Sequence, residues 1–353
     1  PRFNHSSQNF YNELKNRVNA YFKETGKKES GNSILYTKAI LYTLGFAATY
    51  CWLVFFTPAV GWALLGCVLL GGFAATIGFN IMHDGAHGSF SKYPRLNDAA
   101  AWSLNVLGGS SIMWKIKHNV IHHGFTNIEG MDDDIEAQPF LRMAPQQKLY
   151  PLHRFQHIYF PFLYGLLYFA WIFHTDYKKY FTGKVNETPF KSLSAAEHIS
   201  FWSFKVLNLF LFVVLPIIMV GFLPFLIGFA VFVFMTGVSI SIVFQLAHTV
   251  EHTEFPVPDA DTGFIENEWA IHQVNTTANF ATRNKVWHWL LGGLNFQIEH
   301  HLFPKISHVH YPALSRIVKK ACADYGINYI EYPTMRTALA SHVSFLKRMG
   351  VAA

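Results

Sequence analysis

Long runs of apolar residues most constrain what this chain can fold into. Four such runs occupy residues 39–56, 59–81, 203–223 and 224–247. A helix needs roughly 20 consecutive apolar residues to cross the hydrocarbon core of a bilayer. In agreement with a membrane protein, only 14% of the residues are charged, whereas a typical soluble domain has about 25%. The sequence therefore predicts an all-α, polytopic membrane protein with about four transmembrane helices.

The remaining sequence divides the chain into three consecutive regions. Residues 1–35 are polar and mixed in charge, without the short apolar core and small-residue cleavage site of a signal peptide, and we expect them to be cytosolic. Residues 36–320 form the membrane domain, and residues 321–353 form a cytosolic C-terminal tail. Because Thr57-Pro58 is a very short link, the first two apolar runs form a hairpin that returns the chain to the side of its N-terminus.

A fifth apolar stretch, residues 155–173, is harder to assign because it contains a histidine, a proline and several Tyr and Trp residues. Tyr and Trp favour the level of the membrane interface. If this stretch crossed the bilayer, three crossings would separate residues near 120 from residues near 300. The histidines described below need to share one face of the membrane, so we assign residues 155–173 to the interface.

Charge and cysteine content exclude several classes of function. The formal net charge of +6 agrees with Lys- and Arg-rich cytoplasmic flanks, and no run of basic residues alternates with aromatic residues as expected for binding of nucleic acid. The cysteines are Cys51, Cys67 and Cys322, and no two of them form a C-x-x-C pair. The sequence therefore predicts neither a disulfide framework nor a zinc ribbon.

Histidines gather in four tight groups, each next to an apolar segment. The groups are MHDGAH with His83 and His87, KHNVIHH with His118, His122 and His123, AHTVEH with His248 and His252, and QIEHH with Gln297, His300 and His301. Residues four apart are neighbours on one face of a helix. Neutral imidazole is the commonest metal ligand in proteins and suits iron, zinc, copper and nickel. So many polar rings at a membrane boundary would be costly without partners, which favours metal binding.

The number of imidazole nitrogens exceeds what one first-row ion accepts, so we expect two metal ions. Carboxylates near the histidines are candidates to hold the second ring nitrogen of each ligand. These candidates are Asp84, Glu129, Asp132 within the run 132–134, Glu251 and Glu299. For each of them, a solvated surface position is an equally simple interpretation.

Three of the histidine groups resemble the histidine boxes of the membrane fatty acyl desaturases. The matching patterns are His83-x-x-x-His87, His118-x-x-x-His122-His123 and Gln297-x-x-His300-His301, in this order. The glutamine that opens the third box, within GGLNFQIEHHLFP, resembles the front-end subgroup, which inserts a double bond between an existing one and the carboxyl end. The segment EWAIHQVNTTANF, residues 268–280, also resembles the region before this box.

The resemblance implies four spanning helices and a cytosolic helical cap that holds two iron ions, with O2 as co-substrate. It implies that His248 is an additional ligand, and His252 and Gln297 are further candidates. The His-Pro-Gly-Gly motif of a fused cytochrome b5 domain is not found in this sequence, so we expect a separate electron donor, cytochrome b5 or ferredoxin with its reductase. The substrate is an acyl-CoA or a membrane lipid.

The chemistry of the predicted ligands agrees with this function. Removing two hydrogens from unactivated methylene groups requires a strong oxidant from a cofactor, while the protein orients the substrate and excludes side reactions. Candidates for substrate binding are Trp114, Lys115, Lys117 and Trp287. Hydroxylation of an acyl chain or sphingolipid by the same ligand set remains an alternative. Alternatives of another class are a membrane metal transporter and a haem-binding electron carrier.

Overall fold

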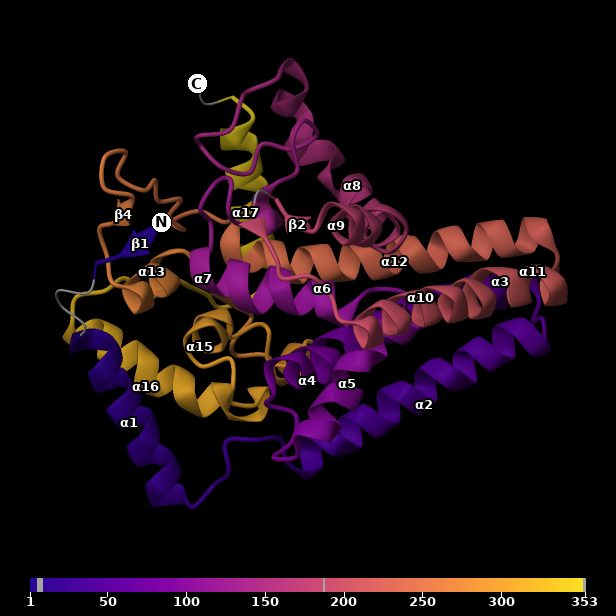
Figure 1. Ribbon diagram of the computed structural model, residues 1–353, viewed down its shortest axis with the longest axis horizontal. Coiled ribbons are helices and arrows are strands. Elements are labelled where there is room, and N and C mark those ends of the chain that lie inside the picture. Colours follow the sequence, from indigo (N-terminus) through magenta and orange to yellow (C-terminus); the bar gives the residue numbers. More distant parts are fainter. Residues whose placement is uncertain (5–8, 187, 352–353) are drawn as a thin grey trace. The chain divides into compact units, whose positions relative to one another are not determined.

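The computed structural model of the protein describes residues 1–4, 9–186 and 188–351 (Figure 1). The chain forms two compact units. The first comprises residues 1–31, 117–160 and 243–353, and the second comprises residues 32–116 and 161–242. These units group residues by packing, whereas the three regions predicted above group them by position relative to a membrane. The division into three regions therefore stays a prediction.

The second unit is built from long apolar helices and the short helices that connect them. Its helices are α2 (Ser33–Phe55), α3 (Val60–Ile77), the π-helical η1 (Gly78–Met82), α4 (His83–His87), α5 (Pro94–Val106), α6 (Ser111–Lys115), the π-helical η5 (Trp171–Thr175), α9 (Asp176–Thr182), α10 (Ala195–Leu209), the π-helical η6 (Phe210–Val214) and α11 (Leu215–Val220). Two helices, α8 (Gln156–Ala170) and α12 (Phe222–His248), contribute residues to both units.

Helices α2 and α3 form the predicted hairpin (Figure 1). Asn32 begins α2 because its side chain accepts hydrogen bonds from the N–H groups of Ile34 and Leu35. A Cβ atom on Gly45 of α2 would lie 2.6 Å from the Phe73 ring of α3, so the small residue permits the close approach of the two helices.

The first unit contains most of the shorter helices. They are α1 (Asn9–Thr25), the π-helical η2 (Ile116–His122), α7 (His123–Phe125), the 3₁₀-helical η3 (Asp133–Ile135), η4 (Pro151–Phe155) and η7 (His308–His310), α13 (Trp269–Asn275), α14 (Lys285–Leu290), α15 (Gln297–Leu302), α16 (Tyr311–Asp324) and α17 (Met335–Met349). Figure 1 shows α1 and α16 side by side, and both pack around α13 and α15. Leu14 of α1, Val274 of α13 and Leu314 of α16 are fully buried in this core.

Within the described residues, regular β structure consists of three two-stranded ladders. Parallel pairs join β1 (Arg2–Phe3) to β4 (Phe264–Ile265) and β5 (Asn279–Phe280) to β6 (Glu331–Tyr332). The antiparallel pair joins β2 (Lys184–Val185) to β3 (Thr188–Pro189). The β5–β6 ladder connects the region before the third histidine group to the C-terminal region.

The prediction of a mainly helical chain with several helices able to span a membrane is confirmed. In the part of the chain that is described, five helical segments are long and apolar enough to cross a membrane: Ser33–Phe55, Val60–His87, Pro151–Thr182, Ala195–Val220 and Phe222–His248. Four of them coincide with the predicted spans. The fifth includes residues 155–173, and its length and composition would also allow it to cross, so its interfacial position stays a prediction.

Candidate metal centre

The second histidine group lies on a π-helical turn. His118 and His122 belong to η2, and His123 begins α7. In an α-helix, residues five apart point to different faces, but the wider i→i+5 winding of a π-helical turn brings them closer together. The ring of His118 consequently lies 5.1 Å from the ring of His122 and 4.8 Å from that of His123, centroid to centroid. All three side chains are at most 5% exposed.

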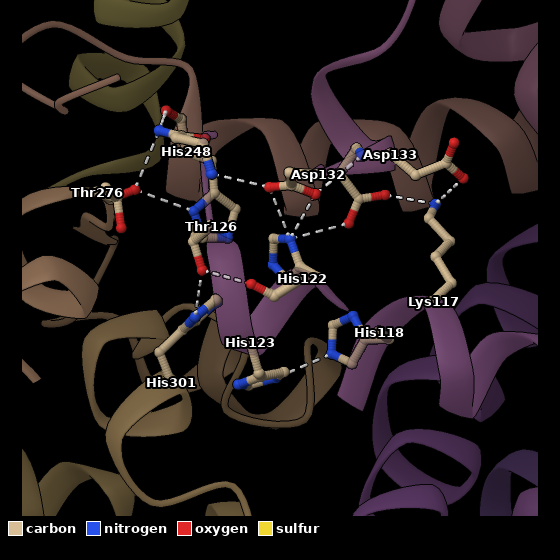
Figure 2. Close-up of polar contacts among 12 residues, drawn as sticks. Lys117, His118, His122, His123, Thr126, Asp132, Asp133, His248, Thr276 and His301 are labelled. Atoms are coloured by element: carbon tan, nitrogen blue, oxygen red, sulfur yellow. Dashed lines mark hydrogen bonds and ion pairs between the residues drawn. The ribbon is translucent and has the colours of Figure 1, made fainter. Parts of the chain in front are cut away.

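Histidines from three separate elements converge beside this turn (Figure 2). His122 comes from η2, His248 from the end of α12, and His301 from α15. One ring nitrogen from each lies within 4.8 Å of the others, and all three side chains are buried. His118, His122 and Asp134 form a second such group.

The Nδ1 atom of each converging histidine has a hydrogen-bond acceptor. His122 Nδ1 lies 3.0 Å from both carboxylate oxygens of Asp132. His248 Nδ1 lies 3.1 Å from the carbonyl oxygen of Thr276, and His301 Nδ1 lies 2.8 Å from the side-chain oxygen of Gln273. A carboxylate or carbonyl oxygen can only accept a hydrogen bond, so the Nδ1 atom opposite it must carry the hydrogen. Each Nε2 atom then presents a lone pair.

His118, His123 and His300 lie together next to these three histidines, and the ring of His123 stacks on that of His301 with a centroid distance of 4.4 Å. The Nε2 atoms of His118 and His123 are 3.2 Å apart, and the ring of His300 lies 4.6 Å from that of His123. His300 Nδ1 is 3.1 Å from the hydroxyl of Tyr311, which fixes the orientation of this ring as well.

This donor set fits a first-row metal ion. The Nε2 atoms of His122 and His248 are buried and have no hydrogen-bond partner in the described part of the protein, and leaving them so would be costly. Nitrogens bound about 2.1 Å from one ion are about 3–4 Å from one another, and the three histidine nitrogens lie within 4.8 Å of one another, close enough for such binding. Neutral imidazoles supported by a carboxylate suit iron among other ions.

A charged cluster lies beside the π-helical turn. Lys117 Nζ is 2.5 Å from Asp134 Oδ1. It is also 3.7 Å from Oδ2 of Asp133, which lies beside it in Figure 2. Burial alone would lower the pKa of Lys117, but the neighbouring carboxylates outweigh it and raise that pKa above its usual range. Burial would likewise raise the pKa of Asp134, but the Lys117 ammonium holds it well below its usual range. Both side chains are therefore charged at neutral pH.

The electrostatic setting of His122 differs from that of an isolated buried histidine. Burial opposes the imidazolium form, but the carboxylates of Asp132 and Asp134 outweigh burial and raise the pKa of His122. A bound cation would find the same favourable field. The carboxylates therefore stabilise positive charge at this position, whether it is a proton or a metal ion.

The first histidine group lies in the second unit. His83 and His87 are the first and last residues of α4, which follows the π-helical η1 and ends at Gly88, in the left-handed conformation. Their rings are buried and 4.7 Å apart. Trp114 contacts both, with ring centroids 5.6 Å from His83 and 5.8 Å from His87. Their spacing thus places both imidazoles on one face, as predicted.

The remaining candidate ligands differ sharply in burial. Gln297, the first residue of α15, is 1% exposed, and its Nε2 atom has no partner among the described residues. His252, in contrast, is exposed in a turn with a φ of 76°. It belongs to none of the candidate metal-binding groups found in the described residues.

Of the carboxylates predicted to hold a histidine, Asp132 has the predicted contact. Glu299 is buried but accepts from Asn279 at 2.8 Å and from Tyr329 at 2.9 Å, and burial raises its pKa to about 7. Glu251 accepts from Ser344 at 2.8 Å. Glu129 is exposed, and Asp84 is buried within α4.

The candidate substrate-binding residues also lie in different surroundings. Trp114 contacts the first histidine group, as described above. Lys115 forms an exposed ion pair with Asp98 at 3.4 Å, and the Lys117 ammonium is held by Asp133 and Asp134. Trp287 is half-buried on α14, a helix with no buried residue.

Several residues that support the histidines were not identified from the sequence. They are Gln273 and Thr276, which hold His301 and His248, and Tyr311, which holds His300. Asn127 is another, because its side-chain N–H groups donate to the carbonyls of His248, Glu254 and Thr276 at 2.9, 3.0 and 3.3 Å. Gln273 and Thr276 lie in the segment EWAIHQVNTTANF, so the resemblance of this segment to the region before the third box could have identified them.

Comparison with known proteins adds an independent line of argument. The profile of the family described as fatty acid desaturase matches residues 59–333. The chain is 37% identical to the sn-1 linoleoyl-lipid 6-desaturase of Synechocystis sp., over 96% of this chain and 95% of that protein. It is 36% identical to the acyl-lipid (8-3)-desaturase of Physcomitrium patens, over 98% and 72%. It is 30% identical to the probable Delta(5) fatty acid desaturase C of Dictyostelium discoideum, over 97% and 76%.

Proposed function

Because the chain belongs to the fatty acid desaturase family, we propose that it is a front-end acyl-lipid desaturase with a di-iron centre. Its activity is that of an oxidoreductase that introduces a double bond into an acyl chain. The convergence of His122, His248 and His301, with each Nδ1 already bonded, is the observation that carries the proposal of a metal centre. The glutamine that opens the third histidine box, Gln297, supports the front-end type.

We propose iron ligands from all three boxes and from the end of α12. They are His83, His87, His118, His122, His123, His248, His300 and His301, with Gln297 as a further candidate. Gln297 is buried at the start of α15, one turn before His300 and His301, which supports its inclusion, whereas the exposed position of His252 argues against a ligand role. When bound, iron supplies the oxygen chemistry that removes two hydrogens from an unactivated pair of methylene groups.

The protein's own residues orient the metal ligands and keep water away from them. Asp132, Thr276 and Gln273 fix the ring orientation of their histidines through Nδ1. The histidine side chains are buried, so ligand exchange with bulk water is limited. Such rigid support from surrounding groups tunes the affinity of a metal site and the geometry at its reactive face.

The substrate and electron donor follow from the family rather than from a bound molecule. The Synechocystis and Physcomitrium patens relatives act, by their names, on acyl lipids, so we propose a membrane acyl lipid as substrate in preference to an acyl-CoA. O2 is the co-substrate. Cytochrome b5, or ferredoxin with its reductase, is the proposed external electron donor. The comparisons support desaturation and give no support to hydroxylation, metal transport or haem-based electron transfer.

We also propose four membrane crossings, with residues 155–173 at the interface and the metal centre on the cytosolic face. The rings of His122 and His301 are 4.9 Å apart, so both residues are on one side of the bilayer. An even number of crossings must therefore separate them. Three segments of spanning length, Pro151–Thr182, Ala195–Val220 and Phe222–His248, lie between them in the sequence, and an interfacial position for the first would give an even number.

The test is the fatty-acid profile of cells that express the protein, are fed polyunsaturated precursors and supply an electron donor. Wild type and His301→Ala are compared at equal levels, with His198→Ala, an exposed histidine on α10, as the matched control. We expect a new double bond nearer the carboxyl end with wild type and His198→Ala, and none with His301→Ala. A hydroxylated product, or an unchanged profile with both candidate donors present, would contradict the proposal.

A further inference from the structure

We propose that Asn279 and Tyr329 are positioning residues that hold the third histidine box in place. The segment 327–332, more than 25 residues beyond the box in the sequence, thereby becomes part of the metal centre. This inference rests on the proposed function, because it assumes that His300 and His301 bind iron. Neither Asn279 nor Tyr329 belongs to a histidine box. Asn279 acts through the backbone of α15 and the carboxylate of Glu299, and Tyr329 acts through the same carboxylate.

Helix α15 depends on support from outside itself. It has only six residues, and its N-cap residue, Phe296, makes no side-chain capping bond. The first N–H groups of a helix have no partner within the helix, and a buried N–H without a partner is costly. Asn279 supplies the missing cap, since its Oδ1 accepts the N–H of Ile298 at 2.9 Å.

The carboxylate of Glu299 forms the second connection. Its two oxygens accept from Asn279 Nδ2 at 2.8 Å and from the Tyr329 hydroxyl at 2.9 Å. Asn279 Nδ2 also lies 2.6 Å from the Tyr329 oxygen, so the three side chains form a closed triangle of hydrogen bonds. Asn279 and Glu299 are both 0% exposed. Glu299 immediately precedes His300, so a displacement of its carboxylate would move the helix that carries both histidines.

The β5–β6 ladder fixes the two partners relative to each other. The N–H of Asn279 donates to the carbonyl oxygen of Ile330 at 2.9 Å, and the N–H of Ala281 donates to the carbonyl oxygen of Tyr332 at 2.8 Å. Lys319 of α16 lies 5.6 Å above the Tyr329 ring and 2.5 Å from Glu331 of β6. The Tyr329 hydroxyl is therefore held by its own backbone and by α16, independently of α15. This makes it a fixed reference for the position of the box.

The expected effect is on the retention of iron. Loss of a group that directly holds a ligand typically lowers metal affinity 10–100-fold, and Tyr329 acts one residue further away, so we expect about threefold to tenfold faster iron loss on its substitution. Tyr329→Phe keeps the ring and removes one hydroxyl, whose hydrogen bonds to Glu299 and Asn279 each contribute modestly to stability. We therefore expect a modest fall in the unfolding temperature of the iron-free protein.

The first experiment compares wild type, Tyr329→Phe and Tyr325→Phe in detergent after anaerobic loading with Fe²⁺. Tyr325 is the matched control, because it is exposed and its hydroxyl makes only a 3.5 Å contact with the carbonyl of Asn9. The rate of iron transfer to a chromogenic chelator is measured alongside the unfolding temperature of each iron-free protein. We expect faster transfer only for Tyr329→Phe, with no more than a modest fall in its unfolding temperature.

The second experiment exchanges the donor and acceptor of the pair. Asn279→Asp removes the donor and places a second carboxylate beside Glu299, and Glu299→Gln removes the acceptor charge. In the double variant, the amide of the new Gln side chain can donate to the new Asp carboxylate, while Asp Oδ1 still accepts from Ile298. We expect the double variant to retain iron longer than either single variant. A general loss of packing would not produce such a rescue.

The outcomes separate this inference from the proposed function. A wild-type protein that retains no iron would overturn the proposed function and this inference with it. A wild type that retains iron while Tyr329→Phe releases it at the same rate would overturn the inference alone. Faster iron loss that merely accompanies a lower unfolding temperature, without rescue in the double variant, would also overturn it.

Discussion

Both carboxylate oxygens of Asp132 lie 3.0 Å from Nδ1 of His122. The same carboxylate accepts the N–H of Asn127 at 2.9 Å and that of Asp134 at 3.0 Å. One fully buried side chain thus orients a histidine ring and also closes the loop that follows the second histidine box. This arrangement fixes the tautomer of His122 and increases the electron density at its Nε2.

Asp132→Asn tests this relationship. The amide keeps one acceptor but loses the charge that favours a cation at His122, so we expect iron affinity to fall about tenfold or more. The measurement is a titration with Fe²⁺ under anaerobic conditions. Asp133→Asn is the control, since Asp133 is only half-buried and lies 3.7 Å from the Lys117 ammonium. Equal affinity for the two variants would contradict a role for Asp132 in metal binding.

Asn127 provides a prediction about stability. It has a φ of 58°, a conformation that costs other non-glycine residues roughly 1–2 kcal/mol, and its amide donates to three carbonyls. Each lost hydrogen bond costs about 1 kcal/mol, so we expect Asn127→Ala to lower the free energy of unfolding by about 3 kcal/mol or more. Denaturant unfolding in detergent measures this change.

Asn127→Gly separates the two contributions at this position. Glycine adopts a positive φ without strain, so this variant loses only the hydrogen bonds and should be more stable than Asn127→Ala by about 1 kcal/mol. If both variants were as stable as wild type, the bonds between this amide and the carbonyls of His248, Glu254 and Thr276 would not contribute to stability.

The sequence predicted where the histidines gather much better than it predicted the residues that hold them. The spacing of His118, His122 and His123 identified the box, but a local sequence does not specify the π-helical turn that brings all three rings together. Asp132 was predicted from its proximity in sequence. Gln273 and Tyr311 reach their histidines through tertiary packing, over 28 and 11 residues, and no periodic pattern marks such contacts.

The Glu299 carboxylate shows the limit of reasoning from proximity in sequence. Its position next to His300 suggested that it would hold a histidine, but it points instead toward Asn279 and Tyr329. The reason is the β5–β6 ladder, which joins residues about 50 positions apart and cannot be read from two-residue strands. In the same way, the single exposed turn containing His252 breaks the apparent i, i+4 relationship with His248.

His342 predicts a dependence of stability on pH. It is fully buried on α17, its Nδ1 donates to the carbonyl of Thr249 at 2.7 Å, and burial lowers its pKa to about 4. In the unfolded chain its pKa is about 6.5. The unfolded state therefore binds more protons between these values, and stability is lost as the pH falls from about 6.5 to 4, by at most about 3 kcal/mol for this residue.

His342→Asn isolates this contribution, because the Asn amide can keep the bond to Thr249 but does not titrate. We expect the unfolding temperature of the variant to depend less steeply on pH than that of wild type between pH 6.5 and 4. Other buried histidines contribute equally to both proteins, so the difference between the two curves reports on His342. Parallel curves would mean that His342 is not buried in its neutral form.

The number of membrane crossings can be tested with single cysteines. In a variant that lacks Cys51, Cys67 and Cys322, an exposed residue is replaced by Cys at Glu129, Lys191 or Lys305. A membrane-impermeant maleimide is then added to sealed vesicles of known orientation.

If residues 155–173 lie in the interface, all three positions are labelled from the cytosolic side, because two crossings separate Lys191 from Lys305 and none separates Glu129 from Lys191. If Pro151–Thr182 crosses the membrane together with the two segments that follow it, Lys191 is labelled from the opposite side to Glu129. The contact between His122 and His301 requires Glu129 and Lys305 to be labelled from one side, so a Lys305 cysteine that reacts only from the opposite side would exclude that contact and the metal centre built on it.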